Sequence, residues 1–388
     1  MRIVYSIPTR IGAGGLGVDS FEALKGIYAR GYLEKVVAYG NRQKEIPANC
    51  IRPMRFYLTK IFSNLPARYY YPVKMKSLDR LTVRVLKKGA DLFHGWSGSS
   101  LRSLVYCRRH GIVSFMENPA PHFRYTEEIM SREYDELGIQ WKKDPEIFKD
   151  FFGFPNLYLQ SEYDEAGYLI LESAFTRDTF LSQGLPGGKL LVIPRGVDTE
   201  RFRPPAERDA RTFRVIFVGA IGVRKGVRYL LEAWKNLRLA NAELLLVGTV
   251  RDDMRYVLEQ YVKSDGSIRV AGFVSDPVRL YREASLFVLP SLSEGSAKVT
   301  YEAMACGLPV IVTPNAGSVV HDGEDGYIVP VRDNALLGEK ILLLYENPGL
   351  REEMGRRARN HIESYTWDAH RKLLIETYEK AYSDAHSG

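Results

Sequence analysis

The chain has 388 residues, of which 45% are hydrophobic, 26% charged and 12% aromatic. This length exceeds what one ordinary hydrophobic core accommodates, and the composition excludes collagen, coiled coil and bulk disorder, so we expect two globular domains. The formal net charge of +7 favours an anionic ligand or surface as a partner.

Targeting signals and cysteines bear on the compartment. The apolar run near the N-terminus is shorter than a signal-peptide core, and no stretch approaches the roughly 20 apolar residues of a membrane span. The cysteines Cys50, Cys107 and Cys306 lie far apart, without paired or metal-ligand spacing. We therefore expect a cytoplasmic protein.

Short runs rich in β-branched residues alternate with helical patterns, first in one half of the chain and then in the other. In chain order, the predicted strands are Arg2–Ile7, Lys35–Tyr39, Asp91–His94, Ile112–Met116, Tyr168–Glu172, Phe213–Val218, Glu243–Val247, Ile268–Gly272, Leu286–Leu289 and Pro309–Thr313. Amphipathic segments such as Gly226–Leu239 lie between many of them. This alternation predicts an α/β protein of two doubly wound, Rossmann-like domains that face each other across a cleft.

The domain boundaries follow from a Pro-rich, charged stretch, Arg201–Arg211, which comes just after the predicted linker. We expect an N-terminal domain over 1–190 and a C-terminal domain over 191–366. No strand follows the last helix, over 367–388, and we expect it to cross back to the first domain. Ligands of such sheets bind beyond the carboxyl ends of the strands, where the loops carry the chemistry.

The first loop, Gly12-Ala-Gly14-Gly15-Leu-Gly17, matches the dinucleotide-binding pattern G-x-G-x-x-G. Two features argue against that interpretation. The predicted first strand ends before Pro8, and the second strand runs into Gly40-Asn41-Arg42 without the acidic residue that binds the ribose. The pattern then indicates a flexible loop whose amides approach a phosphate or a sugar closely.

Residues 51–110 are rich in cations interleaved with aromatic side chains. We weigh three interpretations: a solvated basic face, a peripheral contact with an anionic membrane surface, and, last, nucleic-acid binding, which no recognisable module supports. We expect no nucleic-acid partner. The residues are Arg55, Phe56, Tyr57, Lys60, Phe62, Arg68, Tyr69, Tyr70, Tyr71, Lys74, Lys76, Arg80, Arg84, Lys87, Lys88, Arg108 and Arg109.

The most informative stretch follows the predicted strand Leu286–Leu289. A loop of small residues carries Glu294, and Glu302 lies about one turn inside a helix predicted to start near Lys298. Amides at a helix N-terminus bind anions, and a carboxylate beside them suits the hydroxyls of a sugar. A capped surface helix with two solvated glutamates is the alternative. The expected donor-binding amides belong to Ser296, Ala297, Lys298 and Val299.

This stretch resembles the E-x7-E segment of retaining GT-B glycosyltransferases, most closely glycosyltransferase family 4, whose usual pattern E-G-F/S-x-x-V-x-x-E-A-M-A-C-G-x-P-V-I is followed almost throughout 294–311. The resemblance is close over 160–330 and weaker before residue 130. It includes the linker V-I-P-R-G-V-D of 192–198, the turn G-A-I-G-V-R-K-G of 219–226, the motif S-A-F-T-R of 173–177, and the closing segments of 313–317 and 325–330.

The resemblance implies roles for the second domain. Glu294 would bind sugar hydroxyls, Glu302 the nucleotide ribose, and Lys225 the donor diphosphate. Many family members carry an arginine directly after the glycine of the turn, where this chain has Ala220. Arg224 is the expected substitute. The turn glycine itself, Gly219, belongs to the same donor site.

Other expected contacts are less specific. The glycines Gly14 and Gly15 match the family's early loop near diphosphate and acceptor. His122 is the candidate contact to the donor sugar, against the alternative of a loop histidine with only local hydrogen bonds. The remaining candidates are Glu117, Asn118 and His94 toward the acceptor, and Arg195, Phe273 and Val274 toward the nucleotide.

The resemblance further implies transfer with retention on one face of the sugar, in which the leaving phosphate oxygen accepts the acceptor's proton. The protein then holds the reactants aligned and stabilises charge on the diphosphate. We expect no cofactor and no metal, because no Asp-x-Asp pair follows a strand. The expected partners are a UDP- or GDP-sugar, a glycan or lipid-linked acceptor, and the inner face of the membrane. The alternatives are a sugar-nucleotide-binding protein without transferase activity, or an epimerase on the same fold.

Overall fold

The computed structural model describes residues 1–54, 67–140, 156–208 and 211–387. Parallel strands and covering helices alternate along both halves of the chain. The first half contains β1 (Ile3–Ile11), α1 (Leu16–Ala29), β2 (Leu33–Asn41), η1 (Ala48–Cys50), β3 (Ile51–Pro53), α3 (Ala67–Leu86), β4 (Leu92–Trp96), α4 (Leu101–Arg109), β5 (Val113–Asn118), α5 (Phe123–Glu136), α7 (Asn156–Glu165), β6 (Tyr168–Leu171), α8 (Ala174–Leu181), η3 (Gly187–Lys189) and β7 (Leu190–Val192).

The second half follows the same alternation and ends in three helices. It contains β8 (Phe213–Val218), η4 (Val223–Lys225), α9 (Val227–Leu237), β9 (Ala242–Val247), α10 (Asp252–Ser264), β10 (Ile268–Gly272), α11 (Val278–Glu283), β11 (Leu286–Leu289), α12 (Lys298–Ala305), β12 (Val310–Val312), η5 (Pro314–Ala316), β13 (Gly326–Ile328), α13 (Asn334–Glu346), α14 (Pro348–Ile362) and α15 (Trp367–His386).

The strands form two separate parallel sheets. Within the described residues, the first has seven strands in the order β3-β2-β1-β4-β5-β6-β7, and the second has six in the order β10-β9-β8-β11-β12-β13. The order reverses beside β1 in one sheet and beside β8 in the other. Both sheets are therefore doubly wound, with their ligand-binding edge at these points. The predicted α/β architecture of two Rossmann-like domains is confirmed.

Hydrophobic side chains cover both faces of the N-terminal sheet in two clusters. One cluster includes Tyr5, Phe115 and, from the last helix, Tyr378. The other includes Phe93 and Phe180. In the C-terminal domain, a single cluster joins the sheet to its helices. These fully buried strands explain the near-continuous apolar runs in the sequence.

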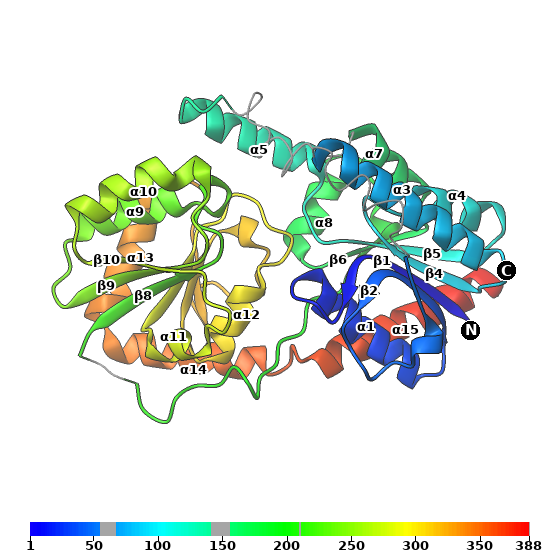
Figure 1. Ribbon diagram of the computed structural model, residues 1–388. Helices are drawn as coiled ribbons and strands as arrows, with labels where there is room; N and C mark the ends of the chain where they lie inside the picture. Colours follow the sequence, from blue (N-terminus) through cyan, green and yellow to red (C-terminus); the bar gives the residue numbers. More distant parts are fainter. Residues whose placement is uncertain (55–66, 141–155, 209–210, 388) are drawn as a thin grey trace.

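Two helices pack on the domain that does not contain their neighbours in sequence. Helix α15 follows the C-terminal domain but lies beneath the N-terminal sheet, against α1 and β5 (Figure 1). Helix α5 follows β5 but reaches over the C-terminal domain, where Met130 and Tyr134 join its hydrophobic core (Figure 1). Each domain core is therefore completed by a helix whose neighbours in sequence belong to the other domain.

Ten strands were predicted at their observed places, with ends shifted by a few residues at several of them. The three-residue strands β3, β7 and β13 were not predicted; β12, of the same length, was predicted because it lies within the apolar run Pro309–Thr313. The predicted helix start near Lys298 is confirmed.

The prediction that the first strand ends before Pro8, at a distance from the glycine loop, was wrong. Strand β1 continues through Pro8 to Ile11, so the glycines do begin directly at its end, and α1 starts at Leu16. A register shift between Ile7 and Arg10 accommodates Pro8 in the strand. As predicted, no acidic residue for a ribose lies at the end of the second strand, because β2 ends at Asn41.

The basic, aromatic segment of 51–110 is described only in part. Arg55, Phe56, Tyr57, Lys60 and Phe62 lie outside the described residues, and so do the side chains of Arg68, Tyr69, Tyr70 and Tyr71. Helix α3 exposes Lys76, Arg80 and Arg84 at intervals of four residues, which places them on one face. Among the described residues, no helix is both long and apolar enough to cross a membrane.

Candidate active site

Two loops meet at the carboxyl ends of neighbouring strands β8 and β11. The backbone amide of Leu292 donates to the carbonyl oxygen of Arg224 at 2.9 Å, which joins the loops directly. Gly226 has a φ of 67°, and a Cβ there would collide with the carbonyl oxygen of Pro290. Glycine is therefore required where the K-G turn packs against the loop that carries Glu294.

Glu294 lies at the centre of a cluster of opposite charges. Its Oε1 accepts from Arg224 Nη1 at 2.6 Å and from Lys225 Nζ at 2.7 Å. Arg224 Nη1 also donates to the carbonyl oxygen of Ser293 at 2.8 Å. Both cations contact Oε1, so within the described residues Oε2 stays available to accept from a hydroxyl.

Burial and charge oppose each other in this cluster. Burial raises the pKa of Glu294, but Arg224 and Lys225 outweigh it and hold that pKa below its ordinary value. Burial lowers the pKa of Lys225, against the opposing pull of Glu294. Arg224 is 37% exposed, whereas Lys225 and Glu294 are each 12% exposed, so Arg224 is the most accessible charge of the three.

Glu302 lies in the second turn of α12, about one helical turn from its start. Its Oε2 accepts from the hydroxyl of Tyr281 at 3.0 Å, and Lys298 Nζ lies 3.8 Å from its Oε1. Burial raises the pKa of Glu302 above its ordinary value, although Lys298 opposes the shift. Tyr281 was not anticipated from the sequence, and it fixes the orientation of the carboxylate.

The amides before and within the first turn of α12 are not all free. The amide of Ala297 donates to the carbonyl oxygen of Ala316 at 3.0 Å, so the expected set of ligand-binding amides is smaller by one. The side chain of Ser296 is buried and its hydroxyl contacts Tyr301 at 3.2 Å. Lys298 and Val299 begin the helix, and the Lys298 side chain is exposed. A positive helix end remains beside Glu294.

The other expected donor contacts lie in loops at the same edges of the two sheets. Phe273 is 76% exposed directly after β10, and Val274 is half-buried. Gly219 ends β8 within reach of Lys225, whose Cε would lie 3.6 Å from an added Cβ. Gly14 and Gly15 are exposed, with open space around an added Cβ.

His94 and Glu117 do not face the cleft, contrary to expectation. His94 Nδ1 lies 2.6 Å from the Tyr378 hydroxyl of α15, and its Nε2 lies 3.1 Å from Glu117 Oε2. Burial lowers the pKa of His94 to about 3 and raises the pKa of Glu117 to about 8. Near neutral pH the histidine is therefore neutral and the carboxyl protonated, in a buried network beneath α15.

His122 is also enclosed rather than presented to a ligand. It precedes α5, where its Nδ1 accepts from the amide of Arg124 at 3.3 Å. Its ring packs among Phe123, Tyr163 and Phe180, and burial lowers its pKa to about 4. It thus corresponds to the alternative of local hydrogen bonds. Asn118, similarly, donates to the carbonyl oxygen of Ala120 at 2.5 Å.

Arg195 is held by two buried carboxylates of the first domain, and its charge also acts on Glu294 and Glu302. Its Nη2 is 2.5 Å from Asp19 Oδ1 and its Nη1 is 3.3 Å from Glu172 Oε2. The two carboxylates raise the pKa of Arg195 in spite of its burial. The arginine therefore ties the linker to α1 and to the end of β6.

The S-A-F-T motif has a role that the sequence did not show. The hydroxyls of Ser173 and Thr176 both donate to the carbonyl oxygen of Gly295, at 2.5 and 2.8 Å. A Cβ on Gly295 would collide with the carbonyl oxygen of Pro119 in the first domain. The residue after Glu294 is therefore held directly by the N-terminal domain.

Helix α5 supplies further contacts between the domains. The Tyr125 hydroxyl accepts from Asn315 Nδ2 at 2.8 Å, and Thr126 and Ser293 share a hydroxyl contact of 3.0 Å. Asn315 also accepts the amide of Glu294 through its backbone carbonyl at 2.9 Å. We name Ser173, Thr176, Gly295, Tyr125 and Asn315 the interdomain clasp. It fixes the backbone on both sides of Glu294.

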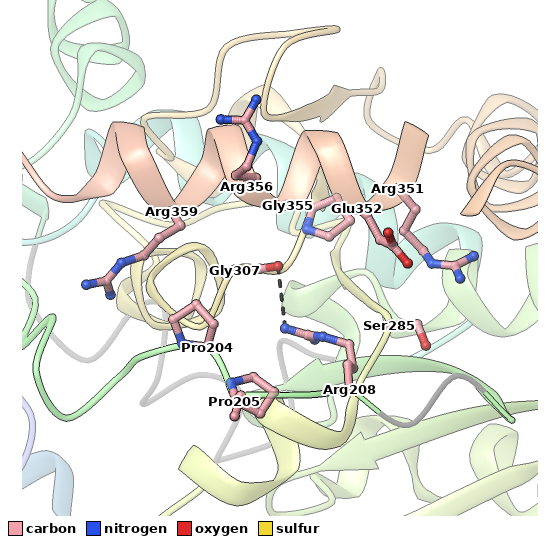
Figure 2. A pocket seen from close by; sticks show the side chains of 12 residues that line it. Pro204, Pro205, Arg208, Ser285, Gly307, Arg351, Glu352, Gly355, Arg356 and Arg359 are labelled. Carbon is pink, nitrogen blue, oxygen red and sulfur yellow. Dashed lines mark hydrogen bonds between the residues drawn. The ribbon is translucent and has the colours of Figure 1, made fainter. Parts of the chain in front are cut away.

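A cavity of about 390 Å³ lies elsewhere, between residues 204–208, which follow the linker, and α14 (Figure 2). Arg208 lines it and donates to the carbonyl oxygen of Gly307 (Figure 2). It also donates to the carbonyl oxygens of Ala284 and Cys306. Arg359 likewise donates to Ala305 at 2.9 Å. These cations cap the negative end of α12, whose other end faces Glu294. The cavity is lined by capping residues and by none of the expected donor residues.

The chain was compared with known proteins. The family model described as glycosyl transferases group 1 matches residues 212–347, which contain Arg224, Lys225, Glu294 and Glu302. A D-inositol 3-phosphate glycosyltransferase from Paenarthrobacter aurescens is 28% identical over 241 residues, which are 57% of this chain and 59% of that protein. The match thus spans less than two thirds of that glycosyltransferase.

Solved structures extend the likeness to the whole chain. Sucrose-phosphate synthase from Thermosynechococcus elongatus superposes with a TM-score of 0.73 at 19% identity, covering 99% of this chain and all of that one. HepE from Anabaena, in complex with UDP-glucose, gives a TM-score of 0.66 at 16% identity and covers 98% of this chain and 100% of its own. The glycosyl transferases group 1 domain therefore forms the second half of a GT-B fold.

Proposed function

We propose that the protein is a retaining glycosyltransferase that moves a sugar from a nucleoside-diphosphate sugar to a hydroxyl acceptor. The observation that carries the proposal is the charge cluster at the ends of β8 and β11, in which Arg224 and Lys225 converge on Glu294. Two cations beside a helix N-terminus suit a diphosphate, and the carboxylate between them suits sugar hydroxyls. The family match over 212–347 supports the same assignment.

In this proposal, Glu302 binds the ribose, because its carboxylate is held by Tyr281 in the same site. The exposed ring of Phe273 provides an apolar edge for the base, together with Val274, and the amides of Lys298 and Val299 face the phosphates. The loop of Gly14 and Gly15 approaches from the first domain. In this proposal, His94, Glu117 and His122 are enclosed by their own contacts and do not touch the donor, whereas the charge of Arg195 acts on Glu294 and Glu302.

The chemistry then rests on alignment and electrostatics. As the bond to the sugar breaks, negative charge grows on the leaving diphosphate, where Arg224 and Lys225 stabilise it without reorganisation. The leaving oxygen accepts the acceptor's proton on the same face, so configuration is retained. We propose that these cations replace a metal ion, and we expect turnover to be unchanged when EDTA is added.

Transfer is tested by incubating the purified chain with UDP-, GDP- and ADP-sugars and measuring release of the nucleoside diphosphate. UDP-sugars come first, because HepE, of similar fold, binds UDP-glucose. We expect release with one donor, an anomeric NMR signal showing retention, and loss of release in Glu294→Gln. Glu346→Gln, at the exposed end of α13, is the matched control. Donor binding without release would instead indicate a sugar-nucleotide-binding protein, and interconversion of donors an epimerase.

We further propose that the acceptor is a glycan or a lipid-linked glycan presented at an anionic membrane surface. The supporting observation is the exposed row of Lys76, Arg80 and Arg84 on α3. Such a row attracts anionic lipid by about 1 kcal/mol per cation near the surface. Co-sedimentation with phosphatidylserine vesicles at low salt tests it, and equal binding of a triple glutamate variant would contradict it.

A further inference from the structure

We propose that His321, Asp325 and His361 bind one zinc ion, at a site separate from the charge cluster around Glu294. The site is not visible in the sequence, because His361 lies 40 and 36 residues from the other two. The fold brings them together: His321 and Asp325 flank the turn before β13, and His361 lies in the last turn of α14.

The three side chains offer ligand atoms that already lie close together. His361 Nδ1 is 2.6 Å from Asp325 Oδ2, His321 Nδ1 is 3.7 Å from the same oxygen, and all three ligand atoms lie within 4.8 Å of one another. A tetrahedral zinc ion with bonds of about 2.0–2.2 Å separates its ligand atoms by about 3.3 Å. Small side-chain movements therefore convert this arrangement into a coordination shell.

The types of donor also suit zinc. Two imidazoles and one carboxylate are common zinc ligands, and the negative carboxylate offsets part of the charge of the ion. The second oxygen of Asp325, Oδ1, accepts the backbone amide of His321 at 2.8 Å. This hydrogen bond fixes the carboxylate and turns Oδ2 toward both histidines, as an outer-shell partner does in metal sites.

A zinc ion can reach the three ligand atoms from solvent, and a fourth ligand is available. The His321 side chain is 60% exposed, so an ion can enter from solvent. Its ring now stacks on that of His361, with centroids 4.2 Å apart at 15°, and it has to rotate for both nitrogens to bind one ion. Water or the exposed Glu324, whose Oε2 is 4.0 Å from His321 Nδ1, completes the shell.

A zinc ion here would stabilise the passage between the domains. The His361 ring packs edge-on against Tyr365, with centroids 5.4 Å apart. The Tyr365 carbonyl accepts the amide of Val197 in the linker at 2.9 Å, and Thr366 pairs with Val197. The ion would join the turn before β13 to the end of α14, directly before the chain crosses to α15.

The test uses the full chain without an affinity tag, treated with EDTA and then freed of the chelator. Zinc is titrated by calorimetry against the wild type and against His321→Ala, an exposed position that does not endanger folding. His386→Ala, another exposed histidine, is the matched control. We expect one zinc per chain in the wild type and the control, and affinity at least about tenfold weaker in His321→Ala.

Two further measurements use the same proteins. Cobalt in place of zinc should give the visible absorption of a four-coordinate ion in the wild type but not in His321→Ala. Zinc should raise the Tm of the wild type and of His386→Ala only. Absence of zinc binding by the wild type, or equal binding by His321→Ala, would overturn the proposal. None of these readouts requires a sugar donor, so they are independent of the proposed transferase activity.

Discussion

Two clusters of polar residues lie on parallel strands or at their ends, and they differ in what covers them. Around Glu294, at the ends of β8 and β11, opposite charges pair beside the N-terminal domain, and Arg224 remains 37% exposed. Around Glu117, on β4 and β5, helix α15 covers the sheet and Tyr378 completes a buried network. Both clusters are largely removed from water. Glu294 keeps its charge because Arg224 and Lys225 outweigh its burial, whereas at Glu117 burial outweighs the more distant cations and raises the pKa.

A polar residue near a strand end is therefore not by itself a site residue. His94 lies within β4, and Glu294 lies in the loop after β11, the strand that corresponds to β4 in the second sheet. Whether such a residue meets a ligand depends on elements that come from elsewhere in the chain. Here the deciding element is the last helix, which follows the C-terminal domain and returns to the first.

The largest effect is expected from Lys225→Ala, which breaks the charged cluster. Losing one electrostatic donor to the leaving group typically lowers turnover by about 10² to 10³. The free energy of unfolding should change far less, because Arg224 still neutralises Glu294. Turnover of the donor identified above is compared with that of Lys235→Ala, an exposed lysine on α9. Near-normal turnover in Lys225→Ala would show that Lys225 does not stabilise the leaving diphosphate.

A smaller effect is expected when the interdomain clasp is weakened. In the double variant Ser173→Ala, Thr176→Val, the carbonyl oxygen of Gly295 loses both hydroxyl donors. An unpaired buried polar group costs about 1–3 kcal/mol, so we expect kcat/KM to fall about tenfold or more as Glu294 becomes less well placed. Thr377→Val, whose hydroxyl bonds only within α15, is the control. Unchanged kinetics in the double variant would show that the clasp does not position Glu294.

The smallest effect is expected from Glu117→Gln, which tests whether the carboxyl group of Glu117 is uncharged in the folded protein. Burial raises the pKa of Glu117 to about 8, so the folded chain keeps a proton that the unfolded chain releases above the ordinary pKa. Wild-type stability therefore contains a contribution that is lost as the pH rises from about 4.5 to 8.

Glutamine does not titrate, and the free energy of unfolding of Glu117→Gln relative to wild type should accordingly increase between pH 5 and pH 8. Urea denaturation at both pH values measures this difference, with Glu346→Gln, at the exposed end of α13, as a control. A difference that does not depend on pH would mean that Glu117 is ionised in the folded state, as Glu294 is.

The sequence predicted much of the fold, because long strands and amphipathic helices show their period locally. It also predicted that Glu294 lies in a loop and Glu302 inside a helix, since small residues precede the regular pattern of α12. It did not predict the burial of His122, which depends on Tyr163 and Phe180 from later helices. Nor did it predict the clasp, because Ser173 and Gly295 are 122 residues apart.

The central claim is that the cluster around Glu294 and Glu302 binds a nucleoside-diphosphate sugar. Its most direct test is the Tm of the wild type and of Glu302→Ala with UDP, GDP, ADP and their sugar conjugates, without metal. We expect one nucleotide to raise the Tm of the wild type, because a ligand that binds only the folded state stabilises it. In Glu302→Ala that rise should be lost, while in Lys235→Ala it should persist. If no nucleotide raises the Tm of the wild type, or if the full rise persists in Glu302→Ala, this cluster does not bind the donor as proposed.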